Sequence, residues 1–338
     1  MSGTIIITGA TGSLAVETVR YLISSHPSLT VIGTVRHVPE SSKSPYLLQL
    51  QAIPREFPKA KLFIKSMDLN SLTEVRSFAD DIANQVATGD LPPIAAIICN
   101  AFTWSLSGAL QFSRDGYEST FQVNHLSHFL LVLKLLSRMD RQSGRVVMLS
   151  SEVHDPEHRN PLSKLGAMFP QEDDMEQLVK PVADSPGTEH DMGWRRYATS
   201  KLANVMFMHS LNYQLEHNPS LGKITVTAMD PGAILDSRAH NEQRTINRFM
   251  FGIMNRLFPL LKFFSSRFRS TADSARDLVA LAMDSKYHGV RGYFDGQKAI
   301  CSASASRDKV RMKALWMACW EWANVEEEET CVGQWLSE

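Results

Sequence analysis

Short apolar runs recur along the chain, separated by longer stretches with the spacing of amphipathic helices. Several runs are apolar at every position, which is typical of strands buried on both faces of a parallel sheet. The predicted strands are Thr4–Thr8, Thr30–Arg36, Lys61–Ser66, Ile94–Cys99, Gly144–Ser151, Lys223–Met229 and Gly292–Gly296. Because helical segments separate most of them, we predict an α/β fold with a doubly wound parallel sheet.

The helical stretches complete this pattern without a linker, repeat or low-complexity segment. Four predicted helices have both ends assigned: Ser13 to about Ser25, about Ser44 to Phe57, Ser270–Ser285 and Ser306–Val325. Of three more, one is predicted to begin near Ser71, one begins at Asp115, and one contains Tyr197. We therefore expect one catalytic domain over residues 1–300 and a helical extension over 301–338. Glu326–Glu329 is interpreted as a solvated acidic tail.

Composition narrows the class of protein. Hydrophobic residues make up 43% and charged residues 21%, as in globular proteins that dissolve in water. Lys plus Arg is 35 against 36 for Asp plus Glu, so the overall charge gives no argument for binding to nucleic acid or to an anionic surface. The four cysteines are scattered, the first residues leave no room for a signal peptide, and no apolar run approaches the ~20 residues that span a bilayer. We expect a cytoplasmic protein.

The first predicted strand leads into a glycine-containing turn and then a helix. This arrangement offers backbone N–H groups and a positive helix end to a pyrophosphate, as in Rossmann-type dinucleotide domains. Many strand–helix turns contain glycine without binding anything, so the turn alone leaves both interpretations open. The predicted cofactor contacts here are Thr8, Gly9, Thr11, Gly12, Ser13 and Leu14.

Arg36 ends the second predicted strand, where a dinucleotide fold meets the adenosine ribose. A carboxylate there binds the free 2′-hydroxyl, whereas an arginine suits a 2′-phosphate, so the sequence favours NADP(H) over NAD(H). A solvated arginine at a strand end is the alternative. Asp68, followed by Leu69, is placed to accept from the adenine amino group or to cap the helix that follows.

Tyr197 and Lys201 lie four residues apart in a helical stretch and so share one face. A fixed ammonium favours phenolate and lowers a tyrosine pKa, which suits proton exchange with a hydroxyl or carbonyl oxygen. A solvated helix face is the ordinary alternative. Ser150 and Ser151 end a buried strand, at the edge of the sheet where ligands bind.

Two further polar groups invite a metal interpretation, which we do not favour. His125 and His128 are three apart in a predicted helix with no third ligand nearby, so packing and surface hydrogen bonding fit better. Residues 152–191 are rich in acidic residues and histidine at irregular spacings. We interpret them as a surface excursion over the site.

Together these motifs resemble the short-chain dehydrogenase/reductase family. The residues that carry the resemblance are the glycine turn, Asn100-Ala101, Asn124, Ser150-Ser151, Tyr197-x-x-x-Lys201 and Asp230-Pro231-Gly232. Asp115–Glu118, Val123–Leu131 and the long interval between Ser151 and Tyr197 resemble the retinol dehydrogenase and protochlorophyllide reductase-like branch. The resemblance covers about Thr4 to Gly232.

The resemblance implies a role for each matched residue. Ser151 would hydrogen-bond the substrate oxygen, Tyr197 would exchange its proton, and Lys201 would lower the tyrosine pKa and hold the nicotinamide ribose. The matched asparagine, Asn124, would hold a water that relays protons to the lysine. Four more residues would contact the cofactor: Asn100, Ala101, Pro231 and Gly232. Ile234 would meet the nicotinamide amide.

Three departures from the family pattern affect these expectations. Ser13 and Ala15 replace the last two glycines of the turn. Phe102 stands where glycine is common, so it either crowds the cofactor or walls the substrate site. Asp236 stands where a threonine is frequent, and because pyrophosphate would repel its carboxylate, either Asp236 turns away or Ser237 takes over the pyrophosphate contact.

Residues 246–268 alternate large apolar side chains with basic ones. An apolar lid closing over a bulky hydrophobic substrate, a basic amphipathic helix on a membrane surface, and additional core are the three interpretations. The lid, placed at about 236–270, is the one we favour.

The sequence thus predicts an NADPH-dependent oxidoreductase that interconverts a ketone and a secondary alcohol on a hydrophobic small molecule. A terpenoid, steroid-like or polyketide skeleton, such as occurs in secondary metabolism, would suit the lid. Two rivals stay open: a non-redox isomerase or dehydratase on the same scaffold, and a cofactor-binding regulator. Many relatives form dimers or tetramers through the helices flanking Asn124 and Tyr197, so a homodimer is also expected unless the long carboxy-terminal extension blocks that contact.

Overall fold

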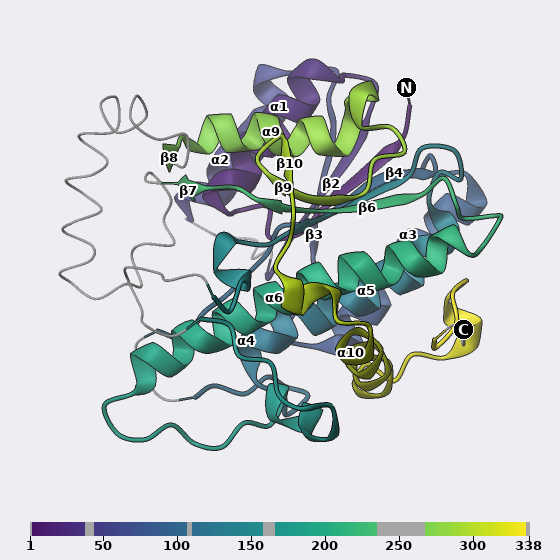
Figure 1. Ribbon diagram of the computed structural model, residues 1–338. Coiled ribbons are helices and arrows are strands. Elements are labelled where there is room, and N and C mark those ends of the chain that lie inside the picture. Colours follow the sequence, from purple (N-terminus) through teal and green to yellow (C-terminus); the bar gives the residue numbers. More distant parts are fainter. Residues whose placement is uncertain (1, 38–43, 107–109, 158–165, 235–267, 336–338) are drawn as a thin grey trace.

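The computed structural model describes residues 2–37, 44–106, 110–157, 166–234 and 268–335. Its centre is a parallel sheet between two layers of helices (Figure 1). Within the described residues the sheet has eight strands in the order β10-β9-β6-β5-β4-β1-β2-β3, and β10 alone among them runs antiparallel to its neighbour. The strands are β1 (Thr4–Ile7), β2 (Thr30–Val35), β3 (Lys61–Ser66), β4 (Ile94–Cys99), β5 (Arg145–Leu149), β6 (Thr225–Asp230), β9 (Gly292–Asp295) and β10 (Lys298–Ile300).

The strand pattern follows directly from the apolar runs. Every residue of β1, β2, β5 and β6 is buried, because helices cover both faces of the sheet. In register, Ile6 of β1 lies beside Ile32 of β2 and Ile97 of β4. β3 forms an edge and alternates between exposed and partly buried residues. The predicted Rossmann-type doubly wound α/β fold is confirmed.

Two hydrophobic clusters lie on opposite faces of the sheet (Figure 1). One contains buried residues of α1 (Ser13–Ser25), α2 (Pro45–Glu56) and α9 (Thr271–Met283). The other contains α3 (Leu72–Thr88), α5 (Ser127–Leu135) and α6 (Glu189–Glu216). The helix that carries Tyr197 and Lys201 is therefore fixed by core packing along most of its length.

The helix predicted from Asp115 begins later. Gly116 has φ +80° in a turn closed by Ser113, so the chain is not helical there. α4 (Ser119–Phe121) starts after Glu118, whose carboxylate accepts the Phe121 N–H at 2.7 Å, and continues as the π-helical η1 (Gln122–Leu126) into α5. The carboxylate of Asp115 instead accepts the Leu72 N–H at 2.8 Å, at the amino end of α3.

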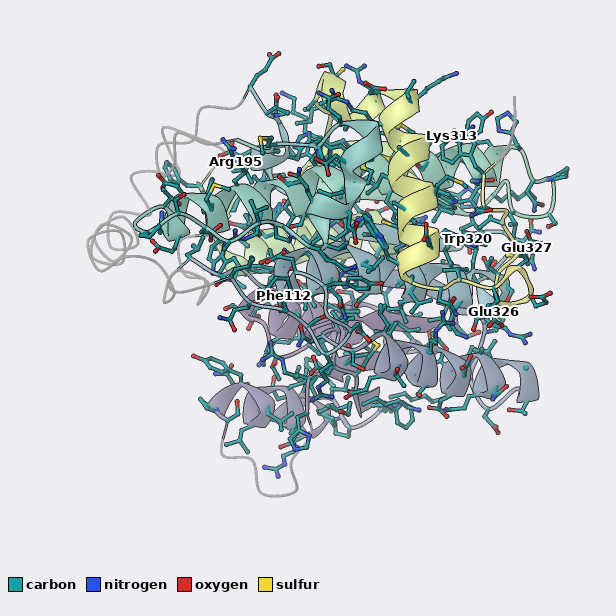
Figure 2. The ribbon with its side chains drawn as sticks, turned by 90° about the horizontal axis from the view of Figure 1, so that it is seen from below. Phe112, Arg195, Lys313, Trp320, Glu326 and Glu327 are labelled. Atoms are coloured by element: carbon teal, nitrogen blue, oxygen red, sulfur yellow. The ribbon has the colours of Figure 1, made fainter. Side chains whose placement is uncertain are left out.

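The carboxy-terminal extension is helical but packs closely on the domain. After η7 (Ser304–Arg307), Asp308 caps α10 (Lys309–Trp322), so the helix is shorter than Ser306–Val325. The Trp316 ring lies 5.1 Å from Phe129 of α5 and 5.9 Å from Phe207 of α6. Figure 2 looks onto this face and shows α10 in front, with Lys313 near its amino end and Trp320 near its carboxyl end.

The interpretation of Glu326–Glu329 as a solvated tail is wrong for Glu329. Its carboxylate accepts hydrogen bonds from Arg76 of α3 at 2.6 Å and from Lys134 of α5 at 2.7 Å. Arg76 also donates to the carbonyls of Ala323 and Asn324. This cluster fastens η8 (Glu327–Glu329) to the helical face, where opposite charges attract more strongly because they are partly buried.

Residues 152–191 are only partly a surface excursion. They contain η3 (Glu152–His154) and η4 (Glu172–Leu178), and Met175, Leu178 and Val179 are buried in the core. The predicted lid, together with Asp236 and Ser237, lies almost wholly outside the described residues. β7 (Ala233–Ile234) precedes the predicted lid and β8 (Phe268–Arg269) lies at its end, and the two strands pair in parallel. In the described part of the chain no helix is long and apolar enough to cross a membrane.

Candidate active site

Tyr197 lies on the buried face of α6 with its hydroxyl beside Ser151. Aromatic rings surround it: Trp104 at 5.0 Å, Trp194 at 5.8 Å and Phe102 at 5.9 Å between centroids. Burial raises the pKa of Tyr197 above its usual value, the nearby charge of Asp230 adds to the rise, and the hydrogen bond with Ser151 opposes it. The phenol is therefore held as a proton donor.

Lys201 is one helical turn further along and almost fully buried. Its ammonium donates to the Leu149 carbonyl at 3.0 Å and lies 5.5 Å from the centre of the Tyr197 ring. Burial lowers the pKa of Lys201 to about 7, against the attraction of Asp230 and Cys99. Burial thus raises the pKa of Tyr197 in these surroundings. The lowering of that pKa by Lys201 stays a prediction.

The two serines after β5 have different environments. Ser150 is buried, and its hydroxyl donates to the Lys201 carbonyl at 3.1 Å, so it anchors α6. Ser151 is partly exposed and hydrogen-bonds Tyr197. Only Ser151 of this pair faces the phenol, as the resemblance implied.

Asn124 holds the loop that follows β4. Its side-chain oxygen accepts the Thr103 N–H at 2.7 Å, and its amide donates to the Thr103 carbonyl at 3.0 Å and to the Ser200 hydroxyl at 2.9 Å. These bonds fix the segment that carries Phe102 and Trp104 beside Tyr197. The water relay stays a prediction. In this structure the Asn124 side chain holds the backbone of Thr103 in place.

Thr8 links the glycine turn to the end of β4. Its hydroxyl accepts the backbone N–H groups of Asn100 and Ala101 at 3.0 and 2.9 Å, and it contacts Nε2 of His128 at 2.9 Å. Because Nδ1 of His128 lies 3.1 Å from the Asn124 carbonyl, Nδ1 carries the proton and Nε2 accepts from Thr8. Burial lowers the pKa of His128 to about 4, which keeps the imidazole neutral.

Close packing requires glycine in the turn, and the helix that follows it presents an uncapped end. Gly9 has φ +65°, and a Cβ there would lie 2.9 Å from the Cβ of Ala101, so no other residue fits without displacement. Gly12 precedes α1 as its capping residue and offers no side chain to the first turn, which also holds no acidic residue. Thr11, Ser13 and Leu14, predicted as contacts, are only partly buried here. An accessible helix end without a carboxylate suits a phosphate group.

Arg36 and Asp68 meet at the other end of the site, beyond β2 and β3. Arg36 Nε is 3.9 Å from an Asp68 oxygen, and the Arg36 side chain is 77% exposed. The predicted capping of α3 by Asp68 is wrong, since Ser71 caps it and Asp68 accepts the Asn70 N–H instead. The Leu69 carbonyl accepts from the Ser127 hydroxyl at 2.6 Å and ties this end of the sheet to α5.

The Pro231-Gly232 turn after β6 is fixed by Asp230, a residue to which sequence reasoning assigned no role. The Asp230 carboxylate accepts the N–H groups of Gly232 at 2.8 Å and Glu152 at 2.9 Å, and so joins this turn to the chain after Ser151. Burial raises the pKa of Asp230 to about 6, against the bond from Gly232. Its place at the end of a fully buried strand was the signal in the sequence. Ile234 follows in β7.

His125 and His128, for which packing and surface hydrogen bonding was predicted, are both buried, so the packing is confirmed and the surface position is not. His125 Nδ1 is 3.0 Å from the side-chain oxygen of Asn204, and burial lowers the pKa of His125 to about 4. His128 belongs to the Thr8 network. Among the described residues, no three His, Cys, Asp or Glu side chains are placed to hold a metal ion.

Comparisons with known proteins identify the family of this chain. A family described as short chain dehydrogenase matches residues 3–158, and one described as AcuH dehydrogenase domain matches 236–332. The short-chain dehydrogenase iccH of Talaromyces variabilis is 30% identical over 366 aligned positions, which cover 98% of this chain and 99% of iccH. The chain belongs to the short-chain dehydrogenase/reductase family.

Other relatives align with most of the length of this chain. The WW domain-containing oxidoreductase of Gallus gallus is 29% identical over 92% of the chain, which spans 66% of that relative's length. The crystal structure of an NADPH-bound carbonyl reductase from chicken fatty liver matches with a TM-score of 0.57 at 14% identity, covering 88% of this chain and 98% of that one. This last likeness shows the fold. Short-chain dehydrogenases/reductases are oxidoreductases that use NAD(H) or NADP(H). The end of α1 at Gly12, with no acidic residue in the first turn, is chemically suited to the pyrophosphate of such a dinucleotide.

Proposed function

We propose that the protein is an NADPH-dependent reductase that interconverts a ketone and a secondary alcohol on a bulky hydrophobic molecule. The observation that carries the proposal is the convergence of Tyr197, Ser151 and Lys201 at the carboxyl ends of β4, β5 and β6. When bound, NADPH supplies a hydride to the carbonyl carbon. The side chains then have to orient the carbonyl and protonate its oxygen.

Each of the three residues suits one part of that task. The raised pKa of Tyr197 keeps its proton available for the oxygen on which negative charge develops. The Ser151 hydroxyl, bonded to Tyr197, is placed to donate to the same oxygen. Lys201, whose pKa of about 7 allows it to gain and lose a proton near neutrality, is suited to return the proton to the phenol and to hold a ribose hydroxyl. We assign the relay water to Asn124, as the resemblance implied.

NADP(H) is proposed as the cofactor on the strength of Arg36. The Arg36 guanidinium is exposed at the end of β2 and no acidic residue precedes it there, which suits a 2′-phosphate. The carbonyl reductase from chicken fatty liver, which shares the fold, has NADPH bound, and this supports the same choice. The glycine turn, Asp68 with Leu69, Asn100-Ala101 and Pro231 to Ile234 complete the proposed cofactor contacts.

The proposed substrate class follows from the aromatic surroundings of the phenol. Phe102 is 42% exposed although its ring contacts Tyr197 and lies 5.3 Å from the Lys201 ammonium. With Trp104 it forms an apolar wall beside the reacting position, which favours a polycyclic, terpenoid, steroid-like or polyketide ketone. The whole-length likeness to a fungal short-chain dehydrogenase supports a setting in secondary metabolism.

The test is NADPH oxidation by the purified protein with a panel of polycyclic and aliphatic ketones, with Tyr197→Phe as the matched control. We expect stoichiometric consumption of NADPH and formation of alcohol, preference for the polycyclic ketones, and loss of turnover in Tyr197→Phe with NADPH affinity retained. Conversion of substrate without consumption of NADPH would establish an isomerase or dehydratase instead. Binding of NADPH with no conversion of any compound would favour a regulator.

A further inference from the structure

His154 lies between the catalytic serine and the carboxy-terminal segment. It ends η3, three residues after Ser151, and is 4% exposed. Its Nδ1 is 2.8 Å from the Ser151 carbonyl oxygen, and its Nε2 is 3.1 Å from the backbone nitrogen of Ala303. A single imidazole thus spans two segments that are 149 residues apart in the sequence.

These partners fix which nitrogen carries the proton. A carbonyl oxygen only accepts and a backbone N–H only donates, so Nδ1 is protonated and Nε2 accepts from Ala303. The Tyr293 ring lies 4.5 Å from the imidazole and packs against it. The ring of His154 is therefore restrained at both nitrogens and along one side.

The segment that supplies the Ala303 N–H is itself anchored to α6. Ser302 Oγ is 2.9 Å from Nε2 of His209, and the Ser306 hydroxyl donates to Ser302 Oγ at 2.8 Å and to the Ala303 carbonyl at 2.7 Å. His154 and His209 thus hold the same short segment from two sides. Of the two, only His154 contacts Ser151.

At the other end of the link, the Ser151 carbonyl receives two donors. The His154 backbone N–H is 3.0 Å from it, in addition to Nδ1. Ser151 has an extended backbone, with φ −164° and ψ 157°. A fixed Ser151 carbonyl fixes the rotation about the Cα–C bond of that residue. The backbone at Ser151 is thereby held in the position from which its hydroxyl faces Tyr197.

We propose that His154 is a positioning residue that couples the docked carboxy-terminal segment to the orientation of Ser151. The tests of this coupling that measure turnover rest on the proposed function, and the test that measures hydrogen–deuterium exchange does not. It assigns the carboxy-terminal region a part in arranging the active site, although none of its residues needs to touch the substrate. Removing the Ala303 donor should then disturb Ser151 from a distance.

Two substitutions of the histidine separate its two bonds. His154→Asn places an amide nitrogen near the position of Nδ1 and retains the bond to Ser151, whereas His154→Gln places its amide near Nε2 and retains the contact with Ala303. We expect kcat to fall on the order of a hundredfold in His154→Gln and about tenfold in His154→Asn, with NADPH affinity unchanged in both. Equal kcat losses in the two variants would contradict the coupling.

Ala303→Pro removes the distant N–H and puts the ring Cδ where that N–H points, so it breaks the bond to Nε2 of His154 while the histidine itself is kept. Ala303 has φ −50° and ψ 144°, which proline adopts readily. We expect a loss of kcat of about tenfold, similar to that in His154→Asn. The matched control is His209→Ala, which loosens the same segment but leaves His154 and Ser151 bonded; its kcat should stay within about twofold of the wild type. If both variants lose kcat equally, the effect is general loosening and the coupling is wrong.

Hydrogen–deuterium exchange provides a readout independent of turnover. The amides of His154 and Asp155, bonded to Ser151 and Glu152, should exchange on the order of tenfold faster in Ala303→Pro than in His209→Ala. Unchanged exchange in Ala303→Pro would overturn the coupling even if the enzyme were active. A wild-type protein that reduces no ketone would overturn the proposed function, while the exchange rates would still decide the coupling.

Discussion

The two ends of the candidate site differ in how far they are removed from water. At one end Lys201 is 2% and Tyr197 8% exposed, among aromatic rings. At the other, the Arg36 side chain is 77% exposed and its ion pair with Asp68 is long, at 3.9 Å. Burial shifts the pKa values of Tyr197, Lys201 and Asp230.

This difference follows from the dielectric environment. A charge in a buried site interacts strongly with its neighbours and is costly to hold, so small changes alter protonation. An exposed charge is screened by water and salt and contributes mainly through the ligand that it meets. Substitutions at the buried end should therefore change chemistry and stability together, and those at the exposed end should change ligand preference alone.

The largest effect is expected from Lys201→Met. Turnover should fall by ~10²–10⁴ because proton return to Tyr197 is lost. Stability should rise, because the pKa of Lys201 falls from 10.5 in the unfolded chain to about 7 in the folded one, so the wild type loses stability as pH falls from about 10.5 to 7. Urea unfolding at pH 6 and pH 10 measures this, and a gain as large at pH 10 as at pH 6 would contradict the burial argument.

Arg36→Ser tests the exposed end. Loss of a charged donor to a 2′-phosphate should weaken NADPH binding by roughly 10- to 100-fold and leave NADH binding nearly unchanged. The free energy of unfolding should move by no more than about 0.5 kcal/mol, since the side chain is exposed. Titration with both cofactors measures the ratio. An unaltered preference for NADPH would show that Arg36 does not read the phosphate.

Asp230→Asn should produce a smaller, pH-dependent change. The Asp230 charge raises the pKa values of both Tyr197 and Lys201, so removing it lowers both and should move the limbs of the pH–rate profile to lower pH. Its own pKa is raised to about 6, so the wild type loses stability as pH rises from 3.8 to about 6, and the variant should lack that loss. Superimposable profiles would refute the electrostatic role.

The smallest effect is expected from Asp68→Asn. Arg36 and Arg114 lie 3.9 and 3.7 Å from its carboxylate and are largely exposed, so the ion pairs should contribute less than about 1 kcal/mol to stability. Thermal unfolding in low and high salt measures the difference, with Arg36→Ser as the partner in a double-mutant cycle. A loss of several kcal/mol would mean that this end is as strongly coupled as the buried one.

The sequence by itself determined the central strands of the sheet and the identity of the family. Apolar runs have no alternative to burial, and short motifs such as Tyr197-x-x-x-Lys201 need only the local period of a helix to bring their side chains to one face. The turn at Gly9 and the strand end at Ser151 could likewise be predicted from neighbouring residues alone. The prediction of a helix start at Asp115 was wrong because the Asp115 carboxylate accepts the Leu72 N–H of α3. No local sequence pattern reveals such a contact.

Tertiary structure alone decided the electrostatics and the distant contacts. Whether the phenol is activated by its lysine or held neutral by burial depends on rings contributed by Phe102, Trp104 and Trp194 from two segments. Glu329 is an ion-pair partner of α3 and α5 and not a solvated tail residue, because the chain returns to those helices. Desolvation and long-range hydrogen bonds depend on what surrounds a residue in space, and the order of residues along the chain does not contain that information.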